Sequence, residues 1–208
     1  MKGQDHEVAF WRNFLERRGR EYEKARPLSS LFNFMIDGKD RVRIANLGAG
    51  AVSLIGEVWE GTEVEVVASD ILANEYAAIR SELGINLYTP VEYEDMTDLL
   101  WKDNAFDIVF CANALDHCQR PRQAIAEMVR ACKLGGWVYL RHIPHEGKRR
   151  GYKGLHQWNI DAYGDGDCEF WTRGRTQHFL LSECCAGFTT RIEPAGRASR
   201  VVSFVKKR

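Results

Sequence analysis

The stretch Val42-Arg-Ile-Ala-Asn-Leu-Gly-Ala-Gly50 constrains the fold of this chain more than any other segment. Its apolar first half is typical of a buried strand, and its glycines predict a tight turn that lets a ligand approach the backbone. A second apolar run, residues 64–69, ends in Asp70, about twenty residues after the turn. A strand, a turn without side chains and a carboxylate after the next strand predict a nucleoside site, in which the acid binds ribose hydroxyls.

The residue three positions after Gly50 separates this turn from a dinucleotide-binding loop. The Gly-x-Gly-x-x-Gly fingerprint has a third glycine at that position, and this chain has Ser53. We therefore expect a nucleoside ligand rather than NAD, and this residue disfavours a nicotinamide-dependent oxidoreductase.

Strand-like and helix-like segments alternate through the middle of the chain. Such alternation is typical of right-handed βαβ units, which bury a parallel sheet between helices. We therefore predict an α/β fold with a mostly parallel sheet covered on both faces. The expected strands span residues 42–46, 63–69, 90–94, 106–111 and 137–143, and the expected helices span residues 6–18, 28–36, 72–83 and 121–134.

The last third of the chain has a different pattern. Gln157-Trp-Asn-Ile and Glu169-Phe-Trp-Thr flank a turn rich in glycine and aspartate, which predicts a β-hairpin. No internal repeat or linker interrupts the chain, so we predict one domain over residues 1–208. After the hairpin we expect a helix over residues 176–185 and strands over 189–193 and 200–205, joined at Pro194-Ala-Gly. The expected parts of the domain are a helical cap (1–40), a cofactor-binding core (41–143), a substrate-side insert (144–175) and a C-terminal helix with strands (176–208).

Composition disfavours several classes of partner. The chain has 29 basic and 29 acidic residues, so its formal net charge is zero. This charge gives no indication of a basic surface that binds a phosphate backbone, and we expect no nucleic-acid partner. No apolar run approaches the roughly 20 residues of a transmembrane helix, and the first residues lack the apolar core of a signal peptide. We therefore expect a cytoplasmic protein without membrane contact. The 6 cysteines form no Cys-x-x-Cys pair and are expected to be reduced thiols.

Five segments between residues 41 and 143 resemble, in order, the motifs of class I S-adenosylmethionine-dependent methyltransferases. They are Asn46-Leu-Gly-Ala-Gly50, the acid at Asp70, Glu94-Asp95-Met96, the run from Phe106 to His117, and Lys133-Leu-Gly-Gly-Trp. The resemblance implies a Rossmann-like, seven-stranded, mostly parallel sheet. It also implies S-adenosylmethionine as cofactor and S-adenosylhomocysteine as product. The cofactor-binding residues implied here are Asn46, Gly48, Ala49, Gly50, Asp70, Ile71, Asp95, Met96, Asn113 and His117.

Both ends of the chain resemble a narrower branch of this family, found among bacterial enzymes of small-molecule and surface-polysaccharide gene clusters. Its motifs Glu-x-x-Phe-Trp, Asn-Ala-Leu-Asp-His and Leu-His-Gln-Trp-Asn stand here at Glu7–Trp11, Asn113–His117 and Leu155–Asn159. The chain departs from the branch at Ala51, where proline is usual, and at His145-Glu146, where Asn-Glu is usual. The helix that carries the first motif is expected to be a lid over the cofactor, a dimer contact or plain packing.

The resemblance implies methyl transfer to a small molecule, and we predict a hydroxyl of a sugar or natural-product intermediate as acceptor. A hydroxyl acceptor benefits from a general base, and histidine suits this role because its pKa lies near neutrality. The candidate catalytic residues are His156, His142 and His145, each of which can instead be a structural histidine. The alternatives are an N-methyltransferase acting on a small molecule and a non-catalytic S-adenosylmethionine-binding protein.

Charged groups in the insert support weaker expectations. The histidines and Glu146 have no His-x-His or His-x-x-x-His spacing, so we predict no metal site. Lys148-Arg149-Arg150 and Lys153 suit either a phosphate on the acceptor or a solvated loop. A homodimer is the one assembly left open.

Overall fold

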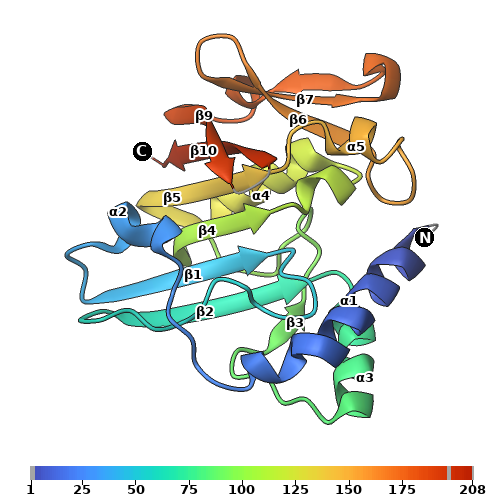
Figure 1. The fold of residues 1–208 in the computed structure, drawn as a ribbon. Coiled ribbons are helices and arrows are strands. Elements are labelled where there is room, and N and C mark those ends of the chain that lie inside the picture. Colours follow the sequence, from blue (N-terminus) through green and yellow to red (C-terminus); the bar gives the residue numbers. More distant parts are fainter. Residues whose placement is uncertain (1–2, 196–197, 208) are drawn as a thin grey trace.

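The computed structural model describes residues 3–195 and 198–207 and contains one large and one small sheet (Figure 1). The large sheet has seven strands in the order β3-β2-β1-β4-β5-β10-β9. Strands β1 to β5 pair in parallel, and β10 is antiparallel to both β5 and β9. This is the Rossmann-like, mostly parallel sheet that the sequence predicts. The strands are β1 (Arg41–Leu47), β2 (Glu63–Asp70), β3 (Val91–Tyr93), β4 (Phe106–Ala112), β5 (Cys132–His142), β9 (Phe188–Ala195) and β10 (Ala198–Lys206).

Helices cover both faces of the large sheet. Along β4, Val109 belongs to the buried cluster of helix α4, whereas Ile108 and Phe110 belong to the cluster of the short helix α2. This alternation follows from the two-residue period of a strand, and it explains why the central strands are apolar throughout. The α-helices are α1 (Gln4–Arg18), α2 (Asn33–Ile36), α3 (Ala73–Leu83), α4 (Pro121–Ala131) and α5 (Glu146–Arg149), and short 3-10 helices span Gly19–Tyr22, Ser30–Phe32, Leu115–His117, Arg173–Arg175 and Leu181–Glu183.

The small sheet extends the core of the large one. Its antiparallel strands β6 (Trp158–Tyr163) and β7 (Asp167–Thr172) confirm the expected hairpin, and β8 (His178–Leu180) adds a third strand. Trp158 and Phe170 belong to the same buried cluster as α4. The insert therefore shares its hydrophobic core with α4 and the large sheet and does not form a separate unit.

The predicted helix over residues 176–185 is wrong. These residues form β8 and a 3-10 turn, because Phe179 is buried in the core through β7 while Glu183 caps the following turn by accepting a hydrogen bond from the Leu180 N–H at 2.8 Å. A pattern of apolar residues over ten positions does not distinguish this strand and turn from a helix.

Helix α4 is shorter than the predicted span to residue 134. It ends at Ala131, and β5 begins at once with Cys132 in extended backbone. The N–H groups of Asn104 and Ala105 donate to the carbonyls of Arg130 and Ala131, so the segment before β4 draws the chain into the sheet. The short helix expected over 28–36 is a 3-10 turn followed by α2.

The strands expected near the C-terminus are confirmed as β9 and β10. Pro194 and Ala195 lie in β9, and Gly196 of the predicted joint lies outside the described residues. Among the helices that the structure describes, none combines the length and apolar character needed to cross a membrane.

Candidate functional site

The glycine turn after β1 lies so close to its neighbours that a side chain at either glycine would not fit. Gly48 and Gly50 have φ angles of 65° and 72°, in the left-handed region that favours glycine. A Cβ at Gly48 would lie 2.3 Å from the Ala114 Cβ, and one at Gly50 would lie 1.9 Å from the indole of Trp11. The turn therefore contacts the segment after β4 on one side and helix α1 on the other.

Asp70 lies at the end of β2, directly beside this turn. One carboxylate oxygen accepts a hydrogen bond from the Gly50 N–H and the other accepts one from the Leu72 N–H, both at 2.9 Å. Burial raises the pKa of Asp70, although the two backbone donors oppose this shift. Each carboxylate oxygen has a further lone pair, so the pair of oxygens can still accept hydrogen bonds from ribose hydroxyls.

The residues around the turn keep its shape. Asn46 is buried and donates from Nδ2 to the Ser53 hydroxyl at 3.2 Å. Ser53, which stands where a dinucleotide site has its third glycine, therefore helps to hold the loop in shape. The Ala49 N–H donates to the Ser69 carbonyl at 2.9 Å. Beside Asp70, the Ile71 side chain is 40% exposed, which provides an apolar surface of the kind that a flat base covers.

Asp95 and Met96 lie in the turn after β3, one strand further along the same edge. Asp95 accepts hydrogen bonds from the N–H and the hydroxyl of Thr97, both at 2.8 Å. The Met96 Cε lies 3.5 Å from the position of a Cβ on Gly48, so this turn and the glycine turn are neighbours. A bare turn, a carboxylate that can accept further hydrogen bonds and an apolar neighbour are the chemical features that S-adenosylmethionine requires, and the residues present fit this cofactor.

Asn113 and His142 hold the segment after β4 in place. The Asn113 N–H donates to His142 Nδ1 at 3.1 Å, and the Asn113 Oδ1 accepts from the Ile143 N–H at 3.0 Å. His142 is only 1% exposed, and its Nε2 is buried without a hydrogen-bond partner among the described residues. Burial lowers the pKa of His142 to about 4, so this imidazole is neutral at physiological pH.

A cluster of polar side chains forms just beyond this segment. His117 Nε2 lies 2.9 Å from His156 Nδ1, and the Asp116 Oδ2 lies 2.8 Å from His156 Nδ1 and 3.3 Å from His117 Nε2. Burial opposes ionisation of Asp116, but the hydrogen bond from His156 and the nearby imidazoles outweigh it and lower the pKa of this carboxyl. The insert thus brings His156 to the loop that carries His117.

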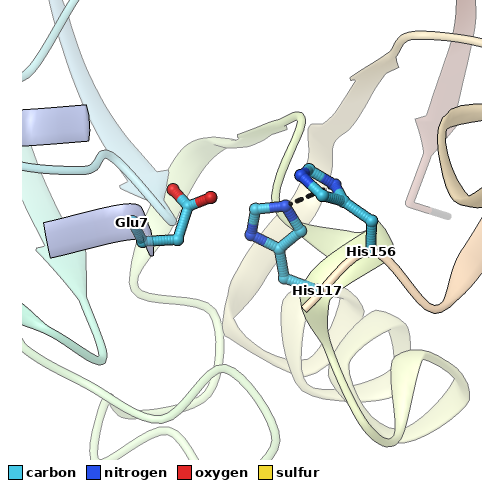
Figure 2. A group of neighbouring side chains, drawn as sticks. All are labelled: Glu7, His117 and His156. Carbon is cyan, nitrogen blue, oxygen red and sulfur yellow. Dashed lines mark hydrogen bonds between the residues drawn. The ribbon is translucent and has the colours of Figure 1, made fainter. Parts of the chain in front are cut away.

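Glu7 of α1 completes this group from the opposite side. Its carboxylate, His117 and His156 offer ligand atoms that all lie within 4.8 Å of one another. In Figure 2 the Glu7 side chain extends from its helix toward the two imidazoles, which face each other across their hydrogen bond. We refer to Glu7, Asp116, His117 and His156 as the histidine cluster.

His145 lies elsewhere in the insert. It precedes α5 with a φ of 55°, its N–H donates to Asp161 at 2.9 Å, and its Nδ1 lies 2.9 Å from the same carboxylate. The indole of Trp171 also donates to Asp161. The structure therefore brings His156 and His117 together, whereas His145 belongs to a network with Asp161 and Trp171.

The basic residues of the insert are partly neutralised. Arg150 donates to Glu146 at 2.6 Å, and Arg149 lies 3.8 Å from the same carboxylate. Glu146 is buried beneath these two arginines, so it is an ion-pair partner rather than a member of the histidine cluster. The metal group weighed from the sequence, with Glu146, therefore does not assemble around this residue.

Helix α1 lies across the edge of the sheet where these groups meet. Figure 1 shows α1 beside the ends of β1 and β2 that carry the arrowheads. Its start contacts the insert, because a Cβ on Gly3 would lie 2.7 Å from the Gly154 Cα, and its middle contacts the glycine turn through Trp11. Tyr22, by contrast, is buried against Phe14 and takes no part in this contact.

Sequence reasoning missed Glu7 and Asp116 as site residues. Both stand inside motifs noted for their resemblance, Glu7 in the Glu-x-x-Phe-Trp helix and Asp116 next to His117. The adjacent acid and histidine are the signal that could have found Asp116, but nothing in the local sequence showed that α1 returns to the same place.

The family of the chain follows from a sequence match and from its fold. Residues 45–140 match the family described as "Methyltransferase domain". No match was found among curated proteins. The seven-stranded sheet agrees with this match, so residues 45–140 belong to a class I S-adenosylmethionine-dependent methyltransferase domain. The predicted cofactor, S-adenosylmethionine, is the cofactor of this class.

Solved structures share the fold. The trans-methyltransferase CalH, solved in complex with SAH, is 16% identical with a TM-score of 0.56, and the alignment covers 84% of this chain and 54% of that chain. The carbon methyltransferase CurJ is 18% identical with a TM-score of 0.54, and the alignment covers 81% of this chain and 50% of that one. A SAM-dependent methyltransferase from Aquifex aeolicus is 17% identical, with a TM-score of 0.47 and coverages of 79% and 82%. The chain thus spans about half the length of CalH and CurJ.

Proposed function

We propose that this chain transfers a methyl group from S-adenosylmethionine to a hydroxyl of a small molecule, such as a sugar or a natural-product intermediate. The observation that carries the proposal is the histidine cluster beside the cofactor turn. Ala114 packs against Gly48, and three residues later His117 faces His156 from the insert. A proton-accepting group therefore lies next to the turn that holds the methyl donor.

The proposed cofactor site uses the turn and the strand ends around it. The turn from Gly48 to Gly50 would hold the methionine end, and Asp70 would accept hydrogen bonds from the ribose. Ile71 would cover one face of the adenine, with Asp95 and Met96 at its edge. Asn46 and Asn113 would support the loops, and His117 would lie between cofactor and acceptor.

The chain contributes alignment and proton transfer to the reaction. When bound, S-adenosylmethionine supplies a methyl group on a sulfonium, whose carbon–sulfur bond breaks as the acceptor oxygen bonds to the methyl carbon. Holding the acceptor in line can contribute roughly 7–11 kcal/mol. A base that takes the hydroxyl proton contributes on the order of 10²–10⁴-fold.

Of the three catalytic candidates, the geometry favours His156. Its Nδ1 contacts the Asp116 carboxylate at 2.8 Å, which orients the ring in the manner of an acid–histidine pair. His142 would act as a positioning residue, because its Nδ1 holds the Asn113 loop. His145 would shape the insert through Asp161.

The test measures cofactor binding and turnover separately. Asp70→Asn keeps the shape of the side chain but removes its charge, so we expect S-adenosylhomocysteine to bind roughly tenfold or more weakly in calorimetry. Asp37→Asn, in an exposed turn after α2, is the matched control and should bind like the unchanged chain. Equal affinity of all three proteins would contradict the proposed ribose contact.

Turnover distinguishes the remaining alternatives. The chain is incubated with S-adenosylmethionine and panels of acceptors that carry only hydroxyls or only amines, and release of S-adenosylhomocysteine is measured. Product from hydroxyl acceptors supports the proposal. Product from amines alone favours the N-methyltransferase, and tight cofactor binding without product from either panel favours a non-catalytic role.

A further inference from the structure

Three electron-rich atoms converge in the histidine cluster. Asp116 Oδ2, His117 Nε2 and His156 Nδ1 are separated by 2.8, 2.9 and 3.3 Å, so they form the corners of a small triangle. They come from the 3-10 helix after β4 and from the insert, and Glu7 faces them from α1 (Figure 2).

The hydrogen bonds among these atoms depend on the tautomers of the two imidazoles. A ring nitrogen of neutral histidine holds either one proton or one lone pair in the ring plane. His156 Nδ1 is within hydrogen-bond distance of both His117 Nε2 and the Asp116 carboxylate, so one ring position has to serve two partners. When each imidazole carries its proton on its other ring nitrogen, all three atoms have a lone pair, and a cation between them would use all three.

The separations also suit a metal ion. Zinc binds imidazole nitrogen and carboxylate oxygen at about 2.0–2.1 Å in tetrahedral sites, which places neighbouring ligand atoms about 3.3 Å apart. The three atoms need to move outward by only a few tenths of an ångström to reach such a site. Two imidazoles and a carboxylate are a ligand set typical of Zn²⁺ and neighbouring transition metals, whereas Mg²⁺ and Ca²⁺ prefer oxygen ligands.

We propose that Asp116, His117 and His156 bind a divalent transition-metal ion of the zinc type, with the fourth coordination position facing Glu7. Three protein ligands and one open position are typical of catalytic zinc sites. The Glu7 carboxylate is within 4.8 Å of the imidazole ligand atoms, close enough to contact an oxygen held in the fourth position.

The ion would assist the same step as the base proposed above, and in this respect the inference rests on the proposed function. A hydroxyl of the acceptor in the open position would lose its proton more readily, because the charge of the ion stabilises the alkoxide. The proton would pass to the Glu7 carboxylate. With the ion bound, His156 is a ligand, and the ion does the work that His156 does as a base in the ion-free chain.

Calorimetry on the full chain, stripped with a chelator and without cofactor or acceptor, tests the site directly. Titration with Zn²⁺ is expected to show one ion per chain. His117→Ala and His156→Ala are each expected to weaken Zn²⁺ binding by roughly 100-fold or more, because each removes a ligand. Replacing Zn²⁺ by Co²⁺ should give the visible absorption of a four-coordinate ion, which the same variants lose.

Two controls separate this site from other zinc ligands. His178→Ala changes a histidine on β8 that contacts Glu169, and it should bind Zn²⁺ like the unchanged chain. Cys184→Ser with Cys185→Ser removes two adjacent half-buried thiols and should also leave the affinity unchanged. Circular dichroism of every variant confirms folding, and Glu7→Gln should retain one ion per chain.

The inference is overturned if the stripped chain binds no Zn²⁺, or if folded His117→Ala and His156→Ala bind it as tightly as the unchanged chain. Binding that disappears with the two cysteines would overturn it as well. These outcomes do not bear on the proposed function, because cofactor affinity and release of S-adenosylhomocysteine are measured on the stripped chain independently.

Discussion

At the scale of single residues, the site depends on side chains that hold backbone rather than ligand. Asp70 ties together the glycine turn and the start of α3, and His142 accepts the N–H of Asn113 from within the core. Gly48 and Gly50 leave room for Ala114 and Trp11. Each of these contacts orients a loop of the proposed cofactor site, so these loops are held in place by the chain itself.

The buried imidazole of His142 predicts a pH dependence of stability. An unfolded histidine takes up its proton near pH 6.5, whereas burial lowers the pKa of folded His142 to about 4. Between these values the unfolded state binds more protons, so the free energy of unfolding falls as the pH is lowered from 6.5 to 4. The full shift corresponds to about 3 kcal/mol.

Denaturant unfolding at several pH values measures this effect. His142→Asn lacks the titrating group, so its free energy of unfolding should fall less than that of the unchanged chain across this window. His6→Gln, at an exposed position on α1, is the control and should keep the full slope. Parallel slopes for the unchanged chain and His142→Asn would contradict the prediction.

At the scale of elements, a buried carboxylate joins the small sheet to the segment that precedes α5. Asp161 on β6 accepts hydrogen bonds from the His145 N–H and the Trp171 indole, at 2.9 and 2.7 Å. It therefore joins β6, β7 and the start of α5, where His145 has a left-handed backbone. Without this acceptor, two part-buried donors lose their partner.

Removal of this carboxylate is expected to destabilise the chain. Asp161→Ala should lower the free energy of unfolding by roughly 1–2 kcal/mol, because two part-buried donors lose their acceptor. Asp165→Ala, at an exposed position in the turn between β6 and β7, is the matched control and should change it by less than about 0.5 kcal/mol. Urea denaturation compares the two, and equal stabilities would show that Asp161 does not hold the insert.

At the scale of the whole molecule, α1 joins parts that are distant in the sequence. It contacts the insert at Gly154, the glycine turn at Gly50 and the histidine cluster through Glu7. Its own anchor is Leu15, which is buried in a cluster with Tyr76 of α3. This placement favours the lid among the roles considered for the helix, and it predicts that cofactor binding and opening of α1 are coupled.

Limited proteolysis measures this coupling. Trypsin cleaves in α1 after Arg12 or Arg17 only when the helix opens, so bound S-adenosylhomocysteine should slow cleavage there in proportion to its occupancy. Lys102 is exposed in the turn before β4, at the opposite edge of the sheet, and cleavage after it should keep its rate. Slowing at neither or at both positions would contradict a lid.

Local sequence was sufficient for the core of the fold and the cofactor turn. The strands β1, β2 and β4 are rich in apolar residues, and this allowed prediction to within a residue or two of the observed ends. Residues 176–185 and the end of α4 were mispredicted, because pairing with β7 and with the segment before β4 outweighed a helical pattern. Long-range pairing of this kind leaves no mark on the local spacing of apolar residues.

The sequence by itself determined the turn and the acid at which we propose that the methyl donor binds, because both follow consecutive strands and meet wherever those strands pair in parallel. The tertiary structure alone decided which side chains lie across from this turn and acid. Glu7, His117 and His156 come from a terminal helix, the loop after β4 and the insert, and only the packing of these three parts brings their polar atoms within 4.8 Å of one another. The two sites differ in how far apart their residues lie in the sequence. Residues of neighbouring elements can be placed from the local pattern, whereas residues of distant elements meet only through the folded core.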